Sequence, residues 1–151
     1  MTKLWLAVCA VSAVGAVGLL IVMSSEPMIA DASDTEMVIL GEEVYANNCA
    51  SCHGDKLEGQ PNWQVRDDEG YLPAPPHDET GHTWHHADSL LFQIIKNGTA
   101  SIAPADYKTR MNNFSDSLTD KEIWASLAFI KSTWSDKERG NQERINRNNQ
   151  N

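Results

Sequence analysis

The chain of 151 residues divides into segments whose hydrophobic patterns differ. Residues 4–23 form an uncharged and mostly apolar run that follows Lys3. A helix of this length rises about 30 Å, which is the thickness of the hydrocarbon core of a bilayer. The run predicts either a retained membrane anchor or a secretory signal cleaved beside Ala30 and Ala32. Both alternatives export the rest of the chain, and the positive charge before the run favours the same orientation.

Residues 24–34 form a polar linker, and amphipathic helical patterns begin after it. Apolar residues then recur at intervals of three and four in three segments, with no alternating strand pattern between them. These residues are Met37, Leu40, Val44 and Tyr45, then Leu91, Ile94 and Ile95, then Ile123, Leu127, Ile130 and Trp134. The pattern predicts an all-α domain over residues 35–134. Residues 135–151 are nearly all polar, and we expect a mobile tail or a frayed helical extension.

Local signals predict where two helices begin and end. Thr119 and Glu122 have the spacing of a capping box, so the last apolar helix begins beside them. A shorter helix is predicted from Asp88, as its N-cap, to Asn97, and Asn97-Gly98 has the pattern of a C-cap. Gly41 lies inside the first helix and costs about 1 kcal/mol relative to alanine. That cost predicts that another helix approaches closely at this position.

Composition and charge narrow the possible functions. The chain has 21 Asp and Glu against 12 Lys and Arg, which gives a net charge of −9. We expect no binding of nucleic acid, because neutralising phosphates requires clustered Lys and Arg. Three cysteines are too few for a dense disulfide framework.

The pentapeptide Cys49-Ala50-Ser51-Cys52-His53 indicates a specific chemistry. It is the C-x-x-C-H sequence that attaches c-type haem. The spacing lets two thiols form thioethers with the two vinyl groups on one porphyrin edge, with an imidazole beneath the iron. A thioredoxin-like pair would follow a strand, and a zinc site would need a second pair of ligands further along the chain. The motif therefore predicts one covalent haem c whose iron is bound by His53.

The second axial ligand is predicted by comparing the methionines of the exported part. Met28 lies in the linker and Met37 lies in the helix that leads into the motif. Only Met111 follows the motif, in the irregular stretch of residues 101–118. We expect Met111 to bind the iron. Ligation by a second imidazole is the alternative, from His77, His82, His85 or His86.

With these residues in place, the chain resembles the class I, monohaem bacterial cytochromes c over residues 40–134. The resemblance rests on Gly41 and Tyr45 before the haem motif, Gly54 after it, Met111 with Phe114, and the final Leu-Thr-Asp-Lys-Glu-Ile-Trp helix. It implies a small helical domain wrapped around one haem. It also implies that the first and last helices cross at Gly41 and Tyr45.

The resemblance carries two further expectations. In the family a proline carbonyl often accepts the Nδ1 proton of the haem-ligating histidine, and Pro75 and Pro76 are the candidates here. The family usually has proline after the ligand methionine, whereas this chain has Asn112. Without the fixed backbone angle of proline, the Met111 loop is expected to be softer.

Residues 57–87 are longer than a minimal cytochrome c needs. They include His77, His82, His85 and His86, and four imidazoles this close in sequence could bind copper or zinc. The other interpretation is that the segment wraps the haem. In that case Trp84 or one histidine donates a hydrogen bond to a haem propionate.

These features predict a one-electron carrier and not an enzyme, because an iron bound by His53 and Met111 has no open position. It would pass electrons between periplasmic or membrane-bound redox proteins, on the periplasmic side of the inner membrane, either anchored there or soluble after signal cleavage. A periplasmic copper-handling haem protein is one alternative. A haem sensor or enzyme with a displaceable Met111 is another. Basic residues close in sequence to Met111 predict a locally basic docking rim, formed by Lys96, Lys108 and Arg110.

Overall fold

The computed structural model describes residues 28–149, so the predicted anchor or signal at residues 1–23 lies outside the described part. Residues 28–149 form only helices and loops. The α-helices are α1 (Thr35–Asn48), α2 (Ala50–His53), α3 (Asp88–Asn97), α4 (Asp120–Ser132) and α5 (Asp136–Asn148), and the 3₁₀ helices are η1 (Thr83–His85) and η2 (Thr99–Ser101). The all-α prediction is confirmed for these residues. None of the helices they form is long and apolar enough to cross a membrane.

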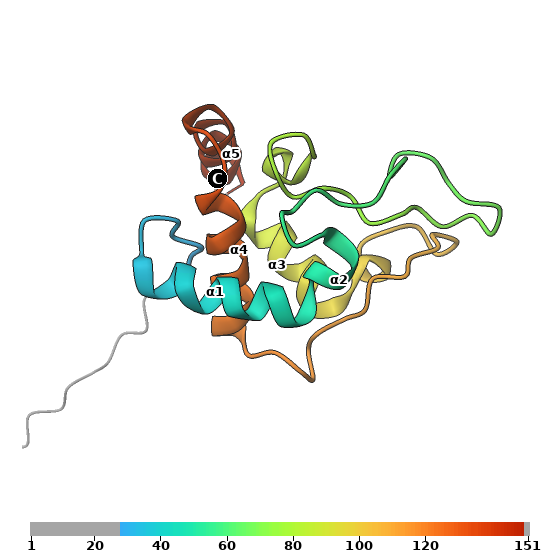
Figure 1. Ribbon diagram of the computed structural model, residues 1–151, viewed down its shortest axis with the longest axis horizontal. Helices are drawn as coiled ribbons and strands as arrows, with labels where there is room; N and C mark the ends of the chain where they lie inside the picture. Colours follow the sequence, from blue (N-terminus) through green and yellow to red (C-terminus); the bar gives the residue numbers. More distant parts are fainter. Residues whose placement is uncertain (1–27, 150–151) are drawn as a thin grey trace, which may run out of the picture.

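Helices α1 and α4 cross in direct contact and form the centre of the domain (Figure 1). A Cβ atom placed on Gly41 would lie 1.9 Å from the carbonyl oxygen of Ala125. Only a residue without a side chain allows the two backbones to approach this closely. One turn further along α1, Tyr45 is 2% exposed and its ring centroid lies 5.4 Å from that of Phe129. The crossing predicted from Gly41 and Tyr45 is confirmed.

The beginning of α4 and the end of α3 follow the sequence signals. The Thr119 hydroxyl accepts from the Glu122 N–H, and the Glu122 carboxylate accepts from the Thr119 N–H, so the capping box is confirmed. Helix α3 spans Asp88–Asn97, and Gly98 follows it with a φ of 80°. The prediction of Asp88 as the N-cap is wrong: Ala87 holds that position, and the Asp88 carboxylate accepts from Lys131 instead. Both helices contribute to the apolar core against α1, through Leu91, Phe92, Ile123, Leu127 and Ala128.

Residues 135–148 of the polar tail form a regular, docked helix, so of the two expected alternatives the chain has the helical extension and not the mobile tail, and this helix is packed against the domain. Helix α5 begins at Ser135, whose side chain caps its first turn. Gln142 is completely buried and its Nε2 donates to the His86 carbonyl at 3.3 Å. The Asn146 side chain accepts from the Asp88 N–H at 2.8 Å. The sequence concealed this docking because the contacts are polar, and no apolar stripe marks the buried face.

Part of the predicted linker also belongs to the folded domain. Ala30 is 4% exposed and packs in the same core cluster as Leu127 and Ala128. The Asp34 carboxylate accepts from the backbone N–H of Met37 at 3.0 Å and caps α1. The chain is therefore fixed to the helices from about residue 30 onward.

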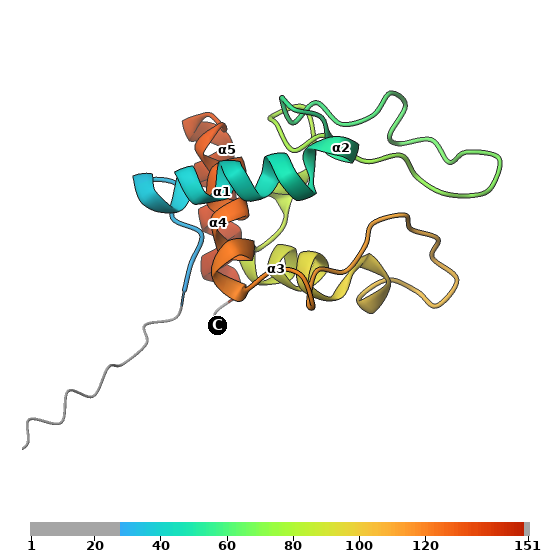
Figure 2. The same cartoon turned by 60° about the horizontal axis from the view of Figure 1, so that its bottom comes forward.

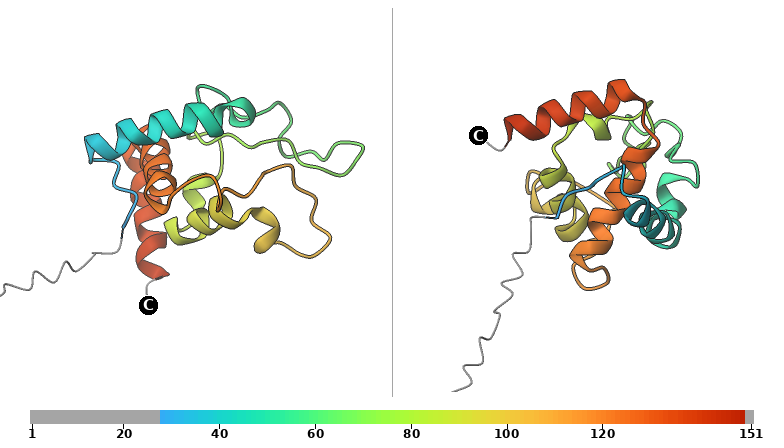
Figure 3. Two further views of the ribbon diagram at one scale, coloured as in Figure 1. Left: turned by 90° about the horizontal axis from the view of Figure 1, so that it is seen from below. Right: turned by 90° about the vertical axis from the view of Figure 1, so that its left-hand side faces the viewer.

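Two long loops extend from one end of the helical body (Figures 2 and 3). One comprises residues 54–82, between α2 and η1, and the other comprises residues 102–119, between η2 and α4. We call them the first loop and the second loop. Helix α2 lies at the same end, so the haem motif and both loops share one region of the molecule.

Candidate functional site

Helix α2 and its N-cap Cys49 place the two motif cysteines one helical turn apart. The N–H groups of Cys52 and His53 both donate to the Cys49 carbonyl, at 3.1 and 2.9 Å. Both thiols are free, with Cys49 half-buried and Cys52 exposed. Burial raises the pKa of the Cys49 thiol to about 11, so this thiol is protonated at neutral pH. The two sulfurs are thus presented from one short rigid element.

His53 is held in a single orientation by the first loop. Its side chain is buried, and Nδ1 lies 2.9 Å from the Pro75 carbonyl oxygen. Because a carbonyl can only accept, Nδ1 carries the proton and Nε2 keeps its lone pair. Burial lowers the pKa of His53, while the bond to Pro75 acts in the opposite direction. The ring is neutral at pH 7, which is the form that binds metals. Of the two candidate prolines, Pro75 is the one that makes the contact.

His77 packs on the His53 ring, a role that the sequence did not indicate. The two ring centroids are 4.1 Å apart with an interplanar angle of 25°. The Nδ1 atom of His77 lies 2.8 Å from the Thr83 hydroxyl, and its carbonyl accepts from the Trp134 indole at 2.7 Å. Two imidazoles stacked face to face cannot lie on opposite faces of one porphyrin. This arrangement therefore disfavours His77 as the second axial ligand.

The four loop histidines do not converge on one point. His82 stacks on Trp63 at 5.1 Å and His85 stacks on Trp84 at 3.7 Å. The His82 and His86 rings lie edge to face, with centroids 5.3 Å apart. Across residues 28–149, no group of three or more His, Cys, Asp or Glu is placed to hold a metal ion. The geometry thus gives no support to the copper-site alternative.

The Trp84 indole is a buried hydrogen-bond donor and packs against the same core cluster as Cys49. Its Nε1 is buried and has no hydrogen-bond partner among the described residues. Buried polar groups are almost always paired, so an unpaired indole N–H indicates an acceptor that the protein itself does not supply. A carboxylate is the strongest such acceptor.

Met111 lies on the second loop and is half-buried. Its sulfur accepts from the Thr99 hydroxyl at 3.6 Å, and its backbone N–H donates to the Thr109 hydroxyl at 3.0 Å. Cys49, Cys52 and His53 are therefore brought together on α2, whereas Met111 is presented separately. The Thr99 contact was not foreseen, because nothing in the sequence indicates that η2 and the second loop meet.

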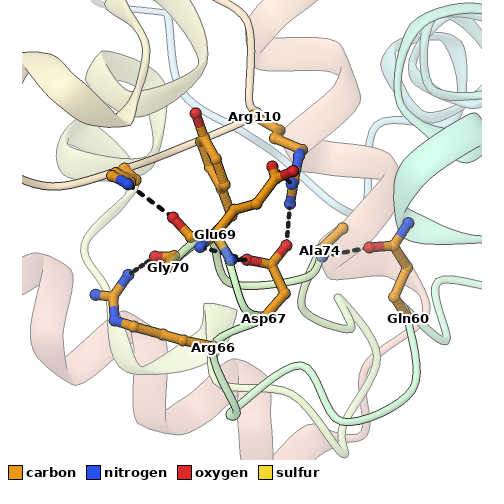
Figure 4. A network of polar contacts seen from close by, with 9 residues as sticks. Gln60, Arg66, Asp67, Glu69, Gly70, Ala74 and Arg110 are labelled. Atoms are coloured by element: carbon orange, nitrogen blue, oxygen red, sulfur yellow. Dashed lines mark hydrogen bonds and ion pairs between the residues drawn. The ribbon is translucent and has the colours of Figure 1, made fainter.

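The expected basic rim is wrong, since all three cations are engaged within the protein. Lys96 forms an ion pair with Asp120 at 2.6 Å. Arg110 binds Asp67 and Glu69, and Lys108 donates to the Glu69 carbonyl at 2.7 Å (Figure 4). Lys108 and Arg110 connect the two loops and Lys96 connects α3 to α4, so the three cations do not form an isolated basic surface.

Comparison with known proteins defines the class. The family model described as Cytochrome c matches residues 38–134, which is more than half of the chain. The chain belongs to the cytochrome c family, and its cofactor is a covalently attached c-type haem with its iron. Its function is haem-based electron transfer. Helix α5 lies beyond the matched residues.

Two curated relatives are both described as Cbb3-type cytochrome c oxidase subunit CcoP. The protein from Rubrivivax gelatinosus is 36% identical over 59 residues, which cover 39% of this chain and 19% of the relative. The protein from Azospirillum sp. (strain B510) is 35% identical over 74 residues, which cover 49% of this chain and 24% of the relative. The chain thus matches about a fifth to a quarter of the length of these relatives. No solved structure gave a match.

Proposed function

We propose that the chain is a one-electron carrier in which Cys49 and Cys52 attach the haem and His53 and Met111 bind its iron. The observation that carries the proposal is the hydrogen bond from His53 Nδ1 to the Pro75 carbonyl. It fixes the tautomer and the ring orientation, so that Nε2 is available as a ligand beside the two motif thiols. When bound, the haem iron supplies the exchange of one electron between its ferric and ferrous states.

The described residues also fit the acidic edge of the group. The unpaired indole N–H of Trp84 is a suitable donor to a haem propionate, in agreement with the expectation for this segment. We assign Trp84 this role. The stacked ring of His77 keeps water and competing ligands from one side of the His53 imidazole.

Met111 gives the proposed site its carrier character. A thioether is a soft ligand that favours ferrous iron, and an iron with both axial positions filled makes and breaks no bonds with substrate. The Thr99 hydroxyl, which donates to the Met111 sulfur, further reduces its electron donation. We therefore expect a positive reduction potential.

The relatives support a proposal about partners and location. Both are named as subunits of a cbb3-type cytochrome c oxidase, so we propose that this domain exchanges electrons with the redox centres of a membrane-bound oxidase. The predicted anchor or signal at residues 1–23 supports export to the periplasmic side of the membrane.

The test uses exported holoprotein, with M37L as the control for M111L. A pyridine haemochrome should give one haem per chain, and ferric protein should show the weak long-wavelength iron–sulfur band. M111L conserves volume but removes the sulfur, so it should lose the band and bind carbon monoxide rapidly once reduced. M37L should keep the band. A wild-type protein without it, or an M111L protein that retains it, would overturn Met111 as the ligand.

A further inference from the structure

The first loop contains a preorganised turn at residues 67–71. The Asp67 carboxylate oxygen Oδ1 accepts from the backbone N–H groups of Glu69 and Tyr71, at 3.0 and 2.8 Å. The Asp67 N–H donates to the Tyr71 carbonyl at 2.9 Å, and the Gly70 N–H donates to the Asp67 carbonyl at 2.9 Å. These bonds leave the second carboxylate oxygen of Asp67 free to accept from outside the turn.

Arg110 of the second loop binds this turn through three kinds of contact (Figure 4). Its guanidinium donates to Asp67 Oδ2 at 2.6 Å and to Glu69 Oε2 at 2.9 Å. The Cζ atom also lies 3.9 Å from the centroid of the Tyr71 ring. Lys108 adds a bond to the Glu69 carbonyl at 2.7 Å, two residues before Arg110. The second loop is thus fastened to the first by adjacent cations. We call the contacts of Arg110 with Asp67, Glu69 and Tyr71 the loop clamp.

The loop clamp lies beside the proposed ligand. Arg110 is the residue immediately before Met111, and Asn112 after it lacks the backbone restraint of the usual proline. The first loop that receives Arg110 is also the one whose Pro75 carbonyl orients His53. A single loop therefore contacts His53 directly and reaches Met111 through its neighbour.

We infer that Arg110 and Asp67 are positioning residues that hold the second loop closed, so that Met111 stays on the iron. The inference rests on the proposed ligation by Met111. The Arg110 and Asp67 side chains are 53% and 36% exposed, and exposed ion pairs are individually weak. A forked guanidinium on two carboxylates and an aromatic ring restrains the backbone more than a single pair would.

The test measures carbon monoxide binding to ferrous holoprotein, because this uncharged probe enters only when Met111 leaves the iron. R110Q and D67N should each raise the association rate about two- to fivefold, the range that such a surface network contributes. The double variant should bind carbon monoxide only a little faster than either single variant, because the two side chains share one contact. The matched control is R144Q, which removes an exposed arginine of α5 whose side-chain partner is Asn141 of the same helix.

The outcomes separate the clamp from the ligation itself. The iron–sulfur band of ferric wild-type protein reports the ligation independently, and its absence would overturn both proposals. If the band is present, the clamp is rejected when R110Q binds carbon monoxide no faster than R144Q. A double variant whose rate increase equals the product of the two single increases would also reject it, since independent effects cannot arise from one shared contact. Faster binding in R110Q and D67N, with R144Q unchanged, supports the clamp.

Discussion

The two sides of the site are held in place by different forces. On the side of His53, the contacts are buried: Nδ1 donates to the Pro75 carbonyl at 2.9 Å, the His77 ring stacks on the His53 ring, and Tyr45 and Trp134 beside them are each 2% exposed. On the side of Met111, the holding contacts are charged and exposed, with Arg110 at 53% and Glu69 at 73%. One side depends on packing and the other depends on ion pairs at the surface.

This difference indicates which side of the site can open. Packing contacts are insensitive to salt and fail only when the core is disturbed. Exposed ion pairs are screened by salt and each contribute less than about 1 kcal/mol. The His53 side should therefore remain in place until the domain unfolds, while the Met111 side should open locally under milder conditions. Three changes test this contrast, in order of decreasing effect.

The largest effect should come from the packed side, at the helix crossing. G41A should lower the free energy of unfolding by about 1–3 kcal/mol, because the new Cβ would meet the Ala125 carbonyl at 1.9 Å. The sign of this change is informative, because helix propensity alone favours alanine over glycine by about 1 kcal/mol and would make G41A stabilising. Denaturant unfolding of holoprotein measures it.

Gly140 of α5 provides the control for this substitution. A Cβ at Gly140 would meet nothing within 4 Å, so G140A should stabilise the protein by up to about 1 kcal/mol. If G41A and G140A changed stability in the same direction, the close crossing would not be the reason for glycine at position 41.

A smaller effect should arise at the Met111 sulfur. T99V removes the hydroxyl that donates to this sulfur at 3.6 Å and keeps the shape of the side chain. The sulfur then donates more strongly to ferric iron, so the reduction potential should fall by at most about 20–40 mV, the equivalent of a weak hydrogen bond for one electron. Redox titration checks this shift. S101A is the control, because the Ser101 hydroxyl in the same turn bonds the Gly98 carbonyl instead; a rise in potential, or an equal fall in S101A, would contradict the role of Thr99.

The smallest effect should appear in acid. The hydrogen bond from Arg110, with that from the Tyr71 N–H, lowers the pKa of Asp67 below its usual 3.8. Because its pKa is lowered, the Asp67 carboxylate stabilises the closed loop at pH values above its unfolded-state pKa. This contribution is lost as the pH falls through the lowered pKa. Carbon monoxide should therefore bind wild type more slowly than D67N at pH 5, and the two rates should converge only once the pH has fallen below the lowered pKa of Asp67. A difference that persisted unchanged in acid would show that the Asp67 charge is not its cause.

The sequence predicted the helical elements well where the signals are local. The capping box at Thr119, the glycine after α3 and the glycine of the α1 crossing each depend on neighbouring residues or on a steric need that only one residue type meets. Pro75 could be named as a candidate only through the family resemblance. The haem motif was recognisable because its chemistry requires a fixed spacing.

The rest could not be predicted, because it depends on polar contacts between segments far apart in sequence. No signal in the sequence near Arg110 indicates that Asp67 is its partner. The three cations near Met111 predicted a basic rim, but in the folded chain they pair with groups of the protein itself. The docking of helix α5 could not be foreseen for the same reason, since Gln142 docks through an amide. Charged and amide groups have no periodic signature, so their burial or pairing is decided only by the folded chain.

The packing of Ala30 has a consequence for how the domain meets other molecules. The chain enters the helical body beside α4, at the end away from α2 and the two loops (Figure 1). Residues 28–34 thus pack at the end of the body opposite to α2 and the two loops. In this arrangement the end of the domain that carries the haem motif is left free of the chain that leads into it over residues 28–34.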